Sequence, residues 1–395
     1  MECFRPPALV RAPASVRLKA VRVLHIVPSF YPAVHYGGPI YSVLHLCLNL
    51  RRLGCEVKVL TTDANGNSRL TAEQQGDPIL DPLKPRFCRR IGRGMVAPGL
   101  ARRLPAEAAW ADVIHLTGVY NFPTFPTLVA TSLCRKPLVW SPRGALQRWK
   151  GSRHVFAKAV WESLCCNLLP RRTTLHVTSE EESAGNSQRL GTTPSCLIRN
   201  GVDIPPLAPP LSNDGVLKLL FIGRLDPVKG IENLIVATSI AARAGMGKWR
   251  LRVAGTGDPG FVAHLRGLIH RAGIASQVEF CGHVEGEDKY REFAASDVVV
   301  VPSHTENFGL VVAEALAHAR PVITSRGTPW REVEQHQCGL WVENDPGSLA
   351  TAIGRINQCD RFAMGQRGRE WMRTDFCWLE RARRMLSLYE QLVRT

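Results

Sequence analysis

The sequence has no hydrophobic run long enough to cross a membrane. A spanning helix needs at least about 18 predominantly apolar residues, and polar or charged residues interrupt every apolar segment of this chain. The start also lacks the apolar core of a secretion signal, because Pro6, Pro7 and Pro13 are interspersed with basic side chains. We expect residues 1–20 to be a disordered basic leader and any contact with a membrane to be peripheral.

The twelve cysteines lack the spacings typical of zinc sites. No Cys-x-x-Cys pair occurs, and no histidine cluster of zinc spacing lies beside a cysteine. A chain of this length does not depend on a disulfide framework. These absences predict reduced, mostly buried thiols in a cytoplasmic protein that needs no metal and no other cofactor.

Acidic residues are scarce in the front half. Residues 1–205 carry 27 Lys and Arg against 13 Asp and Glu, whereas residues 206–395 carry 23 against 21. A basic half favours an anionic partner, which is either nucleic acid or the negatively charged face of a membrane. Because zinc-finger spacing, RNP-like aromatic pairs and a basic zipper are all missing, we expect a membrane surface and no nucleic acid.

Short apolar strands alternate with helical segments in both halves. Residues 21–27 form a strand, and Gly37 and Gly38 then open a helix of apolar period. The alternation restarts after the proline-rich segment 202–215. We therefore predict an α/β protein of two Rossmann-like doubly wound domains, residues 21–205 and 206–375, that face a cleft. Residues 376–395 form a closing helix.

The segment TENFGLVVAEALAHARPVIT places two carboxylates around the start of a helix. Glu306 precedes this helix and Glu314 lies inside it. Unpaired N–H groups at a helix start favour an anion, and ionised carboxylates accept hydrogen bonds from hydroxyls. The pattern indicates a nucleotide-sugar pocket, and an ordinary amphipathic helix with two solvated glutamates is the alternative. The residues expected to supply the N–H groups are Asn307, Phe308, Gly309 and Leu310.

Two cations follow the first strand of the second half. Gly223 ends that strand, Arg224 follows it, and Lys229 begins the next helix with Gly230. Ligands of open α/β sheets bind at the carboxyl edge of the strands, so Arg224 and Lys229 are placed to hold a diphosphate. Each hydrogen bond to a charged group contributes roughly 1.5–3 kcal/mol, against about 0.3–1 kcal/mol from a helix end.

The segment from residue 305 to 324 resembles the signature of retaining glycosyltransferases of family 4, which have the GT-B fold. The spacing G-R-x(4)-K at 223–229 is similar to the donor motif of that family, and the similarity extends over about residues 21–393. The resemblance implies that the closing helix crosses back onto the first domain. It also implies that a phosphate oxygen of the donor, rather than a protein carboxylate, takes the proton of the acceptor.

The resemblance assigns donor contacts to individual residues. It implies that Glu306 binds sugar hydroxyls, that Glu314 binds the ribose and that Gly38 lets backbone reach the diphosphate. The base would lie against Gly282, His283 and Val284, with Lys289 beside it, and the N–H groups of residues 308–310 would hold the sugar and the distal phosphate. Glu306, Arg224 and Lys229 would be the catalytic residues. Because the chain has no Asp-x-Asp to hold a metal, we expect metal-independent transfer.

The acceptor side departs from the family pattern. His115 ends a strand and is one candidate contact, although a lone histidine is as often structural. Where many relatives have a histidine–glycine pair, this chain has Arg143 before Gly144, and an arginine binds an oxygen rather than acting as a base. The segment 148–172 mixes tryptophans with cations, which is typical of an interfacial helix or of an ordinary basic one.

The sequence thus predicts a hexosyltransferase that uses a nucleoside-diphosphate sugar and a saccharide or lipid-linked acceptor at the inner face of a cell membrane, in exopolysaccharide or lipopolysaccharide assembly. Two alternatives remain open. A nucleotide-sugar epimerase on the same architecture would convert the donor without any acceptor. A binding protein without turnover would not need Arg224, Lys229, Glu306 and Glu314 together.

Overall fold

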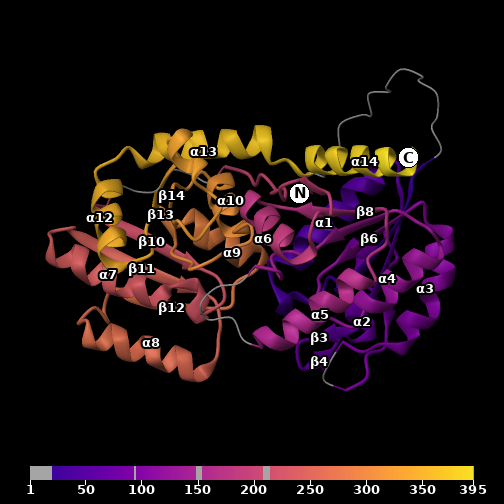
Figure 1. Cartoon of the computed structure of the whole chain (residues 1–395). Coiled ribbons are helices and arrows are strands. Elements are labelled where there is room, and N and C mark those ends of the chain that lie inside the picture. The colour runs from indigo at the N-terminus through magenta and orange to yellow at the C-terminus, as the bar shows by residue number, and fades with distance from the viewer. Residues whose placement is uncertain (1–19, 93–94, 148–153, 208–213, 395) are drawn as a thin grey trace.

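The computed structural model describes residues 20–92, 95–147, 154–207 and 214–394. The predicted leader, apart from its last residue, lies outside the described residues, and so do residues 148–153 of the predicted interfacial segment. The described chain forms two α/β domains, each built on one parallel sheet (Figure 1).

The first domain has a seven-stranded sheet in the order β5-β2-β1-β6-β7-β8-β9, and all of its strand pairs are parallel. A two-stranded hairpin of β3 and β4 stands apart from it. The strands are β1 (Arg22–Ser29), β2 (Glu56–Thr62), β3 (Ala64–Asn65), β4 (Ser68–Arg69), β5 (Arg86–Cys88), β6 (Val113–Thr117), β7 (Leu138–Ser141), β8 (Thr173–Val177) and β9 (Ser195–Leu197). The helices are η1 (Val34–Tyr36), α1 (Gly38–Arg52), α2 (Ala72–Gln75), η2 (Pro78–Leu80), α3 (Pro98–Trp110), α4 (Thr124–Leu133), α5 (Val155–Asn167) and α6 (Glu180–Leu190).

The second domain has a six-stranded parallel sheet in the order β12-β11-β10-β13-β14-β15. Its strands are β10 (Val216–Ile222), β11 (Lys248–Ala254), β12 (Val278–Gly282), β13 (Val298–Val301), β14 (Val322–Ser325) and β15 (Gly339–Val342). Its helices are η3 (Pro227–Lys229), α7 (Ile231–Arg243), α8 (Pro259–Arg271), α9 (Gly286–Ala294), α10 (Leu310–Ala317), α11 (Glu332–Gln335), α12 (Pro346–Asn357) and α13 (Arg361–Asp375).

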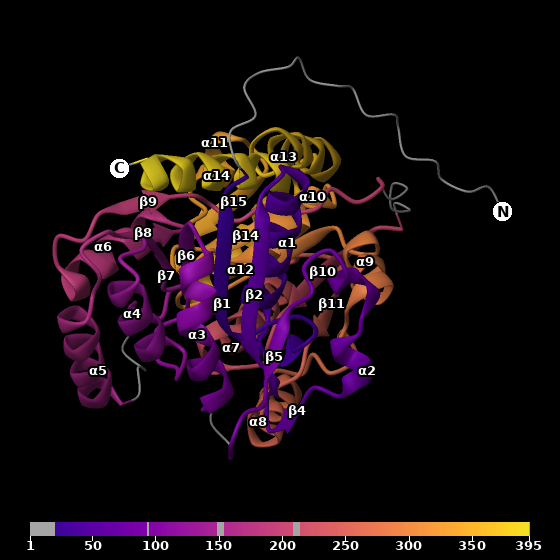
Figure 2. The same cartoon turned by 90° about the vertical axis from the view of Figure 1, so that its right-hand side faces the viewer.

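The last helix, α14 (Trp378–Arg394), belongs in space to the first domain. Figures 1 and 2 show α13 on the second domain and α14 continuing over the first, where it contacts α1 and β6. The inward face of α14 includes Trp378, Met385 and Tyr389, which pack in the core of the first domain. The amphipathic period that predicts this helix thus reflects its burial on one side.

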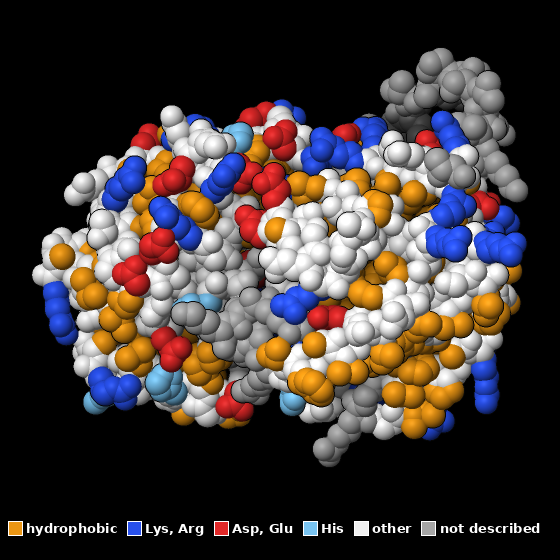
Figure 3. Space-filling model, in the orientation of Figure 1, with side chains coloured by type: hydrophobic (Ala, Val, Ile, Leu, Met, Phe, Trp, Pro, Cys, Tyr) orange, Lys and Arg blue, Asp and Glu red, His pale blue; other side chains and the backbone are white. Residues whose placement is uncertain are grey.

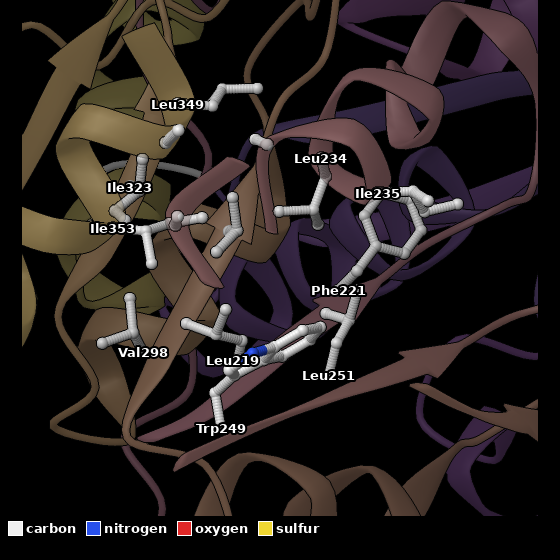
Figure 4. Close-up of a cluster of buried hydrophobic side chains, with 14 of the residues drawn as sticks. Leu219, Phe221, Leu234, Ile235, Trp249, Leu251, Val298, Ile323, Leu349 and Ile353 are labelled. Atoms are coloured by element: carbon white, nitrogen blue, oxygen red, sulfur yellow. The ribbon is translucent and has the colours of Figure 1, made fainter. Parts of the chain in front are cut away.

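Hydrophobic strands covered on both faces form the two cores. β13 is four consecutive valines, all buried, as expected of a central parallel strand. Inside the second domain, side chains of β10 and β11 meet those of α7 and α12; Figure 4 labels Leu219, Trp249, Leu234 and Ile353 among them.

Seen from the side of Figure 1, apolar side chains gather on the lower surface of the first domain, whereas charged side chains of both signs are scattered over the second (Figure 3).

Candidate functional site

The predicted helix start at 305–310 lies where β13 has ended and α10 begins. Gly309 is the residue before the helix, with a left-handed φ of 72° that favours glycine. Phe308 is buried against Trp330, whose indole N–H donates to the Phe308 carbonyl. The buried tryptophan therefore fixes the loop that turns into α10.

Glu306 is held in this loop by three hydrogen bonds. Its backbone N–H donates to the Gly327 carbonyl at 2.8 Å. Its Oε1 accepts from Ser303 Oγ at 2.8 Å and from Lys229 Nζ at 2.5 Å. In the described part of the chain, no residue donates to Oε2. The carboxylate is thus fixed at one oxygen and has a second oxygen available for a hydroxyl.

Glu314 makes a similar pair on α10. Its Oε1 accepts from Lys289 Nζ of α9 at 2.6 Å, and both side chains are largely buried. The sequence places Lys289 near the base, whereas the structure brings it directly to the carboxylate expected to bind the ribose. Each of the two carboxylates in the predicted signature therefore has its own lysine.

The other residues predicted to bind the donor surround the same edge of the sheet. Arg224 follows β10 and projects outward, with 67% of its side chain exposed and its Nε 3.8 Å from Asp226 Oδ2. Gly282 ends β12 with φ at 74°, and its carbonyl accepts from Gly255 N at 2.6 Å. His283 is exposed, and Val284 packs against the second core. The carboxyl ends of β10, β12 and β13 thus collect all these residues.

Two glycines of the first domain face this edge directly. A Cβ on Gly38 would lie 3.8 Å from Leu310 Cδ2, which is ordinary contact distance. A Cβ on Gly144 would lie only 2.7 Å from the Cβ of Asn307. Asn307 also donates from Nδ2 to Thr178 Oγ1 at 2.8 Å. The structure therefore brings Gly38 and Gly144 together with the 307–310 loop, which sequence spacing alone did not show.

Arg143 stands at the end of β7 in a left-handed conformation, with φ at 57°. Its Nη1 donates to Asn200 Oδ1 at 2.6 Å, and its buried Nε has no hydrogen-bond partner in the described residues. Burial lowers the pKa of this guanidinium, while the negative charge of Glu182 opposes the decrease. A cation with an unused buried donor is suited to an anionic or strongly polar ligand.

Sequence reasoning missed Glu182, which holds the loop after β7. Its Oε1 accepts from Gly144 N at 2.6 Å and its Oε2 from Thr178 N at 2.7 Å. The Ser-x-x-Glu pattern from Ser179 to Glu182 signals a capped helix, and Ser179 Oγ does accept from Glu182 N. That local pattern does not reveal that the carboxylate supports a loop nearly forty residues earlier.

The expected contact between His115 and a sugar needs correction. His115 is 0% exposed, and its Nδ1 lies 2.5 Å from the hydroxyl of Tyr389 on α14. Its Nε2 lies 2.6 Å from Ser141 Oγ, and its ring stacks on His25 with centroids 4.2 Å apart. Burial holds the pKa of His115 well below its ordinary value. The histidine therefore fastens the closing helix to the sheet instead of facing a ligand.

The described residues contain neither a metal-binding cluster nor a membrane-spanning helix. No group of three His, Cys, Asp or Glu side chains is placed to hold a metal ion there. No helix of the described chain is long and apolar enough to pass through a bilayer.

Comparisons with known proteins match both domains. Residues 37–201 match the glycosyl transferase 4-like domain, and residues 217–358 match glycosyl transferases group 1. Glycogen synthase of Mycobacterium tuberculosis is 28% identical over 389 residues, covering 88% of this chain and 89% of the synthase. The uncharacterized glycosyltransferase MJ1607 of Methanocaldococcus jannaschii is 36% identical over 140 residues, which is 35% of either chain.

Solved structures show the same architecture. HepE of Anabaena in complex with UDP superposes with a TM-score of 0.73 at 19% identity, covering 94% of this chain and 100% of HepE. This likeness confirms the predicted GT-B fold. Since the two family matches together span most of both domains, the chain belongs to the glycosyl transferases group 1 and is a glycosyltransferase.

Proposed function

We propose that this glycosyltransferase moves a hexose from a nucleoside-diphosphate sugar to a saccharide or lipid-linked saccharide, with retention of anomeric configuration. The observation that carries the proposal is the pairing of Lys229 with Glu306 and of Lys289 with Glu314 on either side of the start of α10. Two carboxylates and three cations at one sheet edge match the mixed chemistry of a nucleotide sugar.

The diphosphate is held by side-chain cations and by backbone donors. Arg224 is largely exposed at the end of β10, and Lys229 reaches the same edge from the end of η3. The N–H groups at the start of α10 supply further donors, and the helix dipole favours an anion there. Fixed cations stabilise the charge that develops on the leaving diphosphate, so we propose that transfer needs no metal ion.

The sugar and the ribose are read by the two carboxylates. Glu306 offers Oε2 to the hydroxyls of the hexose while Ser303 continues to hold Oε1. Glu314 accepts from the ribose, and the base lies along the backbone of residues 282–284, where φ at Gly282 is 74°. Lys229 exchanges its contact with Glu306 for the diphosphate when the donor arrives, because two negative phosphates attract it more than one carboxylate does.

The first domain supplies the acceptor side. In the reaction, the bond between the anomeric carbon and the diphosphate oxygen breaks, and a bond to the acceptor oxygen forms on the same face. The acceptor proton passes to the departing phosphate oxygen. Arg143 and Gly144 adjoin this position, and Arg143 steadies a negative or polar oxygen without exchanging a proton. The protein contributes position and electrostatics.

UDP-glucose is the first donor to test, because HepE has been crystallised with UDP, with UDP and glucose, and with UDP-glucose. We further propose that the acceptor is presented at the cytoplasmic face of a membrane, in polysaccharide assembly. The basic first half of the chain supports an anionic surface as partner.

The test is turnover of UDP-glucose and GDP-mannose with and without a panel of oligosaccharide acceptors and a chelator. We expect nucleoside diphosphate release that requires the acceptor, survives the chelator and yields an α-linked product from an α-linked donor. Appearance of an epimerised nucleotide sugar without any acceptor would contradict the proposal. So would undiminished transfer by Glu306→Gln.

A further inference from the structure

Helix α5 has an apolar stripe on its exposed side. Phe156, Val160, Leu164 and Leu168 follow one another at intervals of four residues, so they lie on one face of the helix and its C-terminal cap. Phe156 is 83% exposed, and the other three are between 38% and 48% exposed. None of the exposed residues from 155 to 168 is charged. A helix facing only water is expected to carry its charged residues on this side.

The opposite side of α5 packs against the first domain. Cys165 is buried, and the Trp161 indole donates to the Val119 carbonyl at 2.9 Å. Glu162 is buried too, where it accepts from the Tyr120 hydroxyl and lies 3.7 Å from Arg189 Nη1. The helix is thus anchored to the first domain by its opposite face, and no described segment of the chain covers the apolar stripe.

Helix α4 extends the same apolar surface. Phe125 of α4 and Trp161 of α5 pack with ring centroids 4.2 Å apart, so the two helices are neighbours. Val129 and Leu133 on α4 are 42% and 78% exposed. Figure 3 shows apolar side chains gathered over the part of the first domain where Figure 1 places α4 and α5. We define the docking face as Val129, Leu133, Phe156, Val160, Leu164 and Leu168.

Positive charge borders the docking face. Between residues 113 and 179 the chain has nine Lys and Arg and a single acidic residue, Glu162. Of these nine, Arg143 belongs to the candidate site, and Arg148, Lys150 and Arg153 lie outside the described residues. That glutamate is buried and paired, so it does not offset the positive charge at the surface. Arg135 follows α4 and Arg171 follows α5, and both are exposed. An uncharged apolar centre with an exposed arginine just beyond the C-terminal end of each helix complements a bilayer with anionic headgroups.

The length of α5 decides how it meets the bilayer. Its 13 residues span about 20 Å, which is shorter than the roughly 30 Å of a hydrocarbon core. The helix is also fixed to the domain by Trp161 and Cys165. Against a bilayer, the helix would therefore lie along the surface, with the stripe among the acyl chains and the cations at the headgroups.

We propose that the docking face binds an anionic lipid surface and so brings the transferase to a membrane-borne acceptor. The role of lipid binding rests on the proposed function, because docking would bring the enzyme to its acceptor. The binding itself is measured without donor or acceptor. A failure of transfer and a failure of docking are therefore distinguishable.

The experiment is co-sedimentation of the full chain with vesicles of phosphatidylcholine alone, or of equal parts of phosphatidylcholine and phosphatidylglycerol. We expect binding to the anionic vesicles that weakens as salt rises. Phe156→Ser with Leu164→Ser should weaken it at least about tenfold, since two exposed apolar side chains lose their burial. Each of Arg135→Ala and Arg171→Ala should weaken it by about fivefold.

Matched controls distinguish binding through the docking face from nonspecific adsorption of the protein to vesicles. Phe362 on α13 is 60% exposed and Arg271 ends α8 with an exposed side chain, so Phe362→Ser and Arg271→Ala should leave vesicle binding unchanged. Glu306→Gln should still bind vesicles, and the docking-face variants should still transfer sugar to a water-soluble acceptor. Equal binding to both vesicle types, or equal loss in the control variants, overturns the proposal. If light scattering shows a dimer that Phe156→Ser dissociates, and the protein does not bind vesicles, the docking face binds a second copy of this chain and the lipid proposal is wrong.

Discussion

Lys229 Nζ lies 2.5 Å from Glu306 Oε1, although the two residues are 77 positions apart in the chain. Lys229 comes from the end of η3 and Glu306 from the loop after β13, so the pair joins two strand ends of the second domain. Each side chain neutralises the charge of the other at the proposed donor site. The pair therefore holds both proposed catalytic groups in position before a donor binds.

The first prediction concerns the two lysines. Lys229→Met should lower kcat by about 10²–10³-fold, because it removes a donor to the charge that develops on the leaving diphosphate. Lys289→Met should mainly raise KM for the donor, since Lys289 contacts Glu314, the carboxylate proposed to bind the ribose. Steady-state kinetics with saturating acceptor separates the two effects. Equal losses of kcat in both variants would contradict these separate roles.

The second prediction concerns the contact between the domains at Gly144. Gly144→Ala should raise KM for both substrates, because the new methyl group would lie 2.7 Å from the Cβ of Asn307 and force the loops apart. Gly191→Ala is the matched control: its φ of 62° is also left-handed, but open space surrounds its Cβ position. Both substitutions strain a left-handed backbone, so both should lower the temperature of thermal unfolding, but only Gly144→Ala should raise KM. A similar rise of KM in both variants would mean that backbone strain, and not the contact with Asn307, causes it.

The third prediction concerns acid. Burial lowers the pKa of His25 and His176 from 6.5 to about 3. These rings lie near the positive charge of Arg143, which opposes protonation further. Since the unfolded chain takes up protons first as the pH falls below 6.5, their contribution to stability is complete at higher pH and is lost on acidification.

Urea unfolding should show this loss. One unit below the unfolded pKa, each neutral buried histidine makes the free energy of unfolding smaller by about 1.4 kcal/mol. We therefore expect a decrease of a few kcal/mol between about pH 7.5 and about pH 5.5. A free energy of unfolding that stays level over that range would show that the histidines protonate without cost in the folded chain.

The fourth prediction concerns the closing helix. Tyr389→Phe should lower the free energy of unfolding by about 1–3 kcal/mol, because it leaves a buried nitrogen of His115 without a partner. Tyr290→Phe is the control, since among the described residues the hydroxyl of Tyr290 makes only a long 3.4 Å bond to Pro206 O. Chemical unfolding of both variants gives the comparison. If both substitutions lower the free energy of unfolding equally, the hydrogen bond between α14 and the sheet does not contribute to stability.

The parts that could be predicted are those written locally in the chain. Apolar runs such as the four valines of β13 predict buried parallel strands, and Gly309 before an apolar helix predicts the start of α10. Glu306 and Glu314 lie within one segment, so their neighbourhood is evident from spacing. Arg224 and Lys229 likewise follow a single strand, which fixes the edge at which they lie.

The parts that could not be predicted depend on contacts between distant segments. Nothing local indicates that Glu182 supports Gly144 or that Asn307 bonds to Thr178 of the other domain. The buried position of His115 could not be predicted for the same reason. Its position at a strand end suggests a ligand contact, but Tyr389 arrives from α14, 274 residues later, and takes its Nδ1. Only the folded chain shows which strand-end side chains are enclosed.

The most direct test is a crystal structure of the chain with UDP-glucose or a non-transferable analogue. We expect Lys229 to leave Glu306 Oε1 and contact the diphosphate together with Arg224, while Glu306 accepts from hexose hydroxyls and Glu314 from the ribose. A bound donor whose diphosphate lies away from Arg224 and Lys229, with the 2.5 Å lysine–carboxylate pair still intact, would contradict the account.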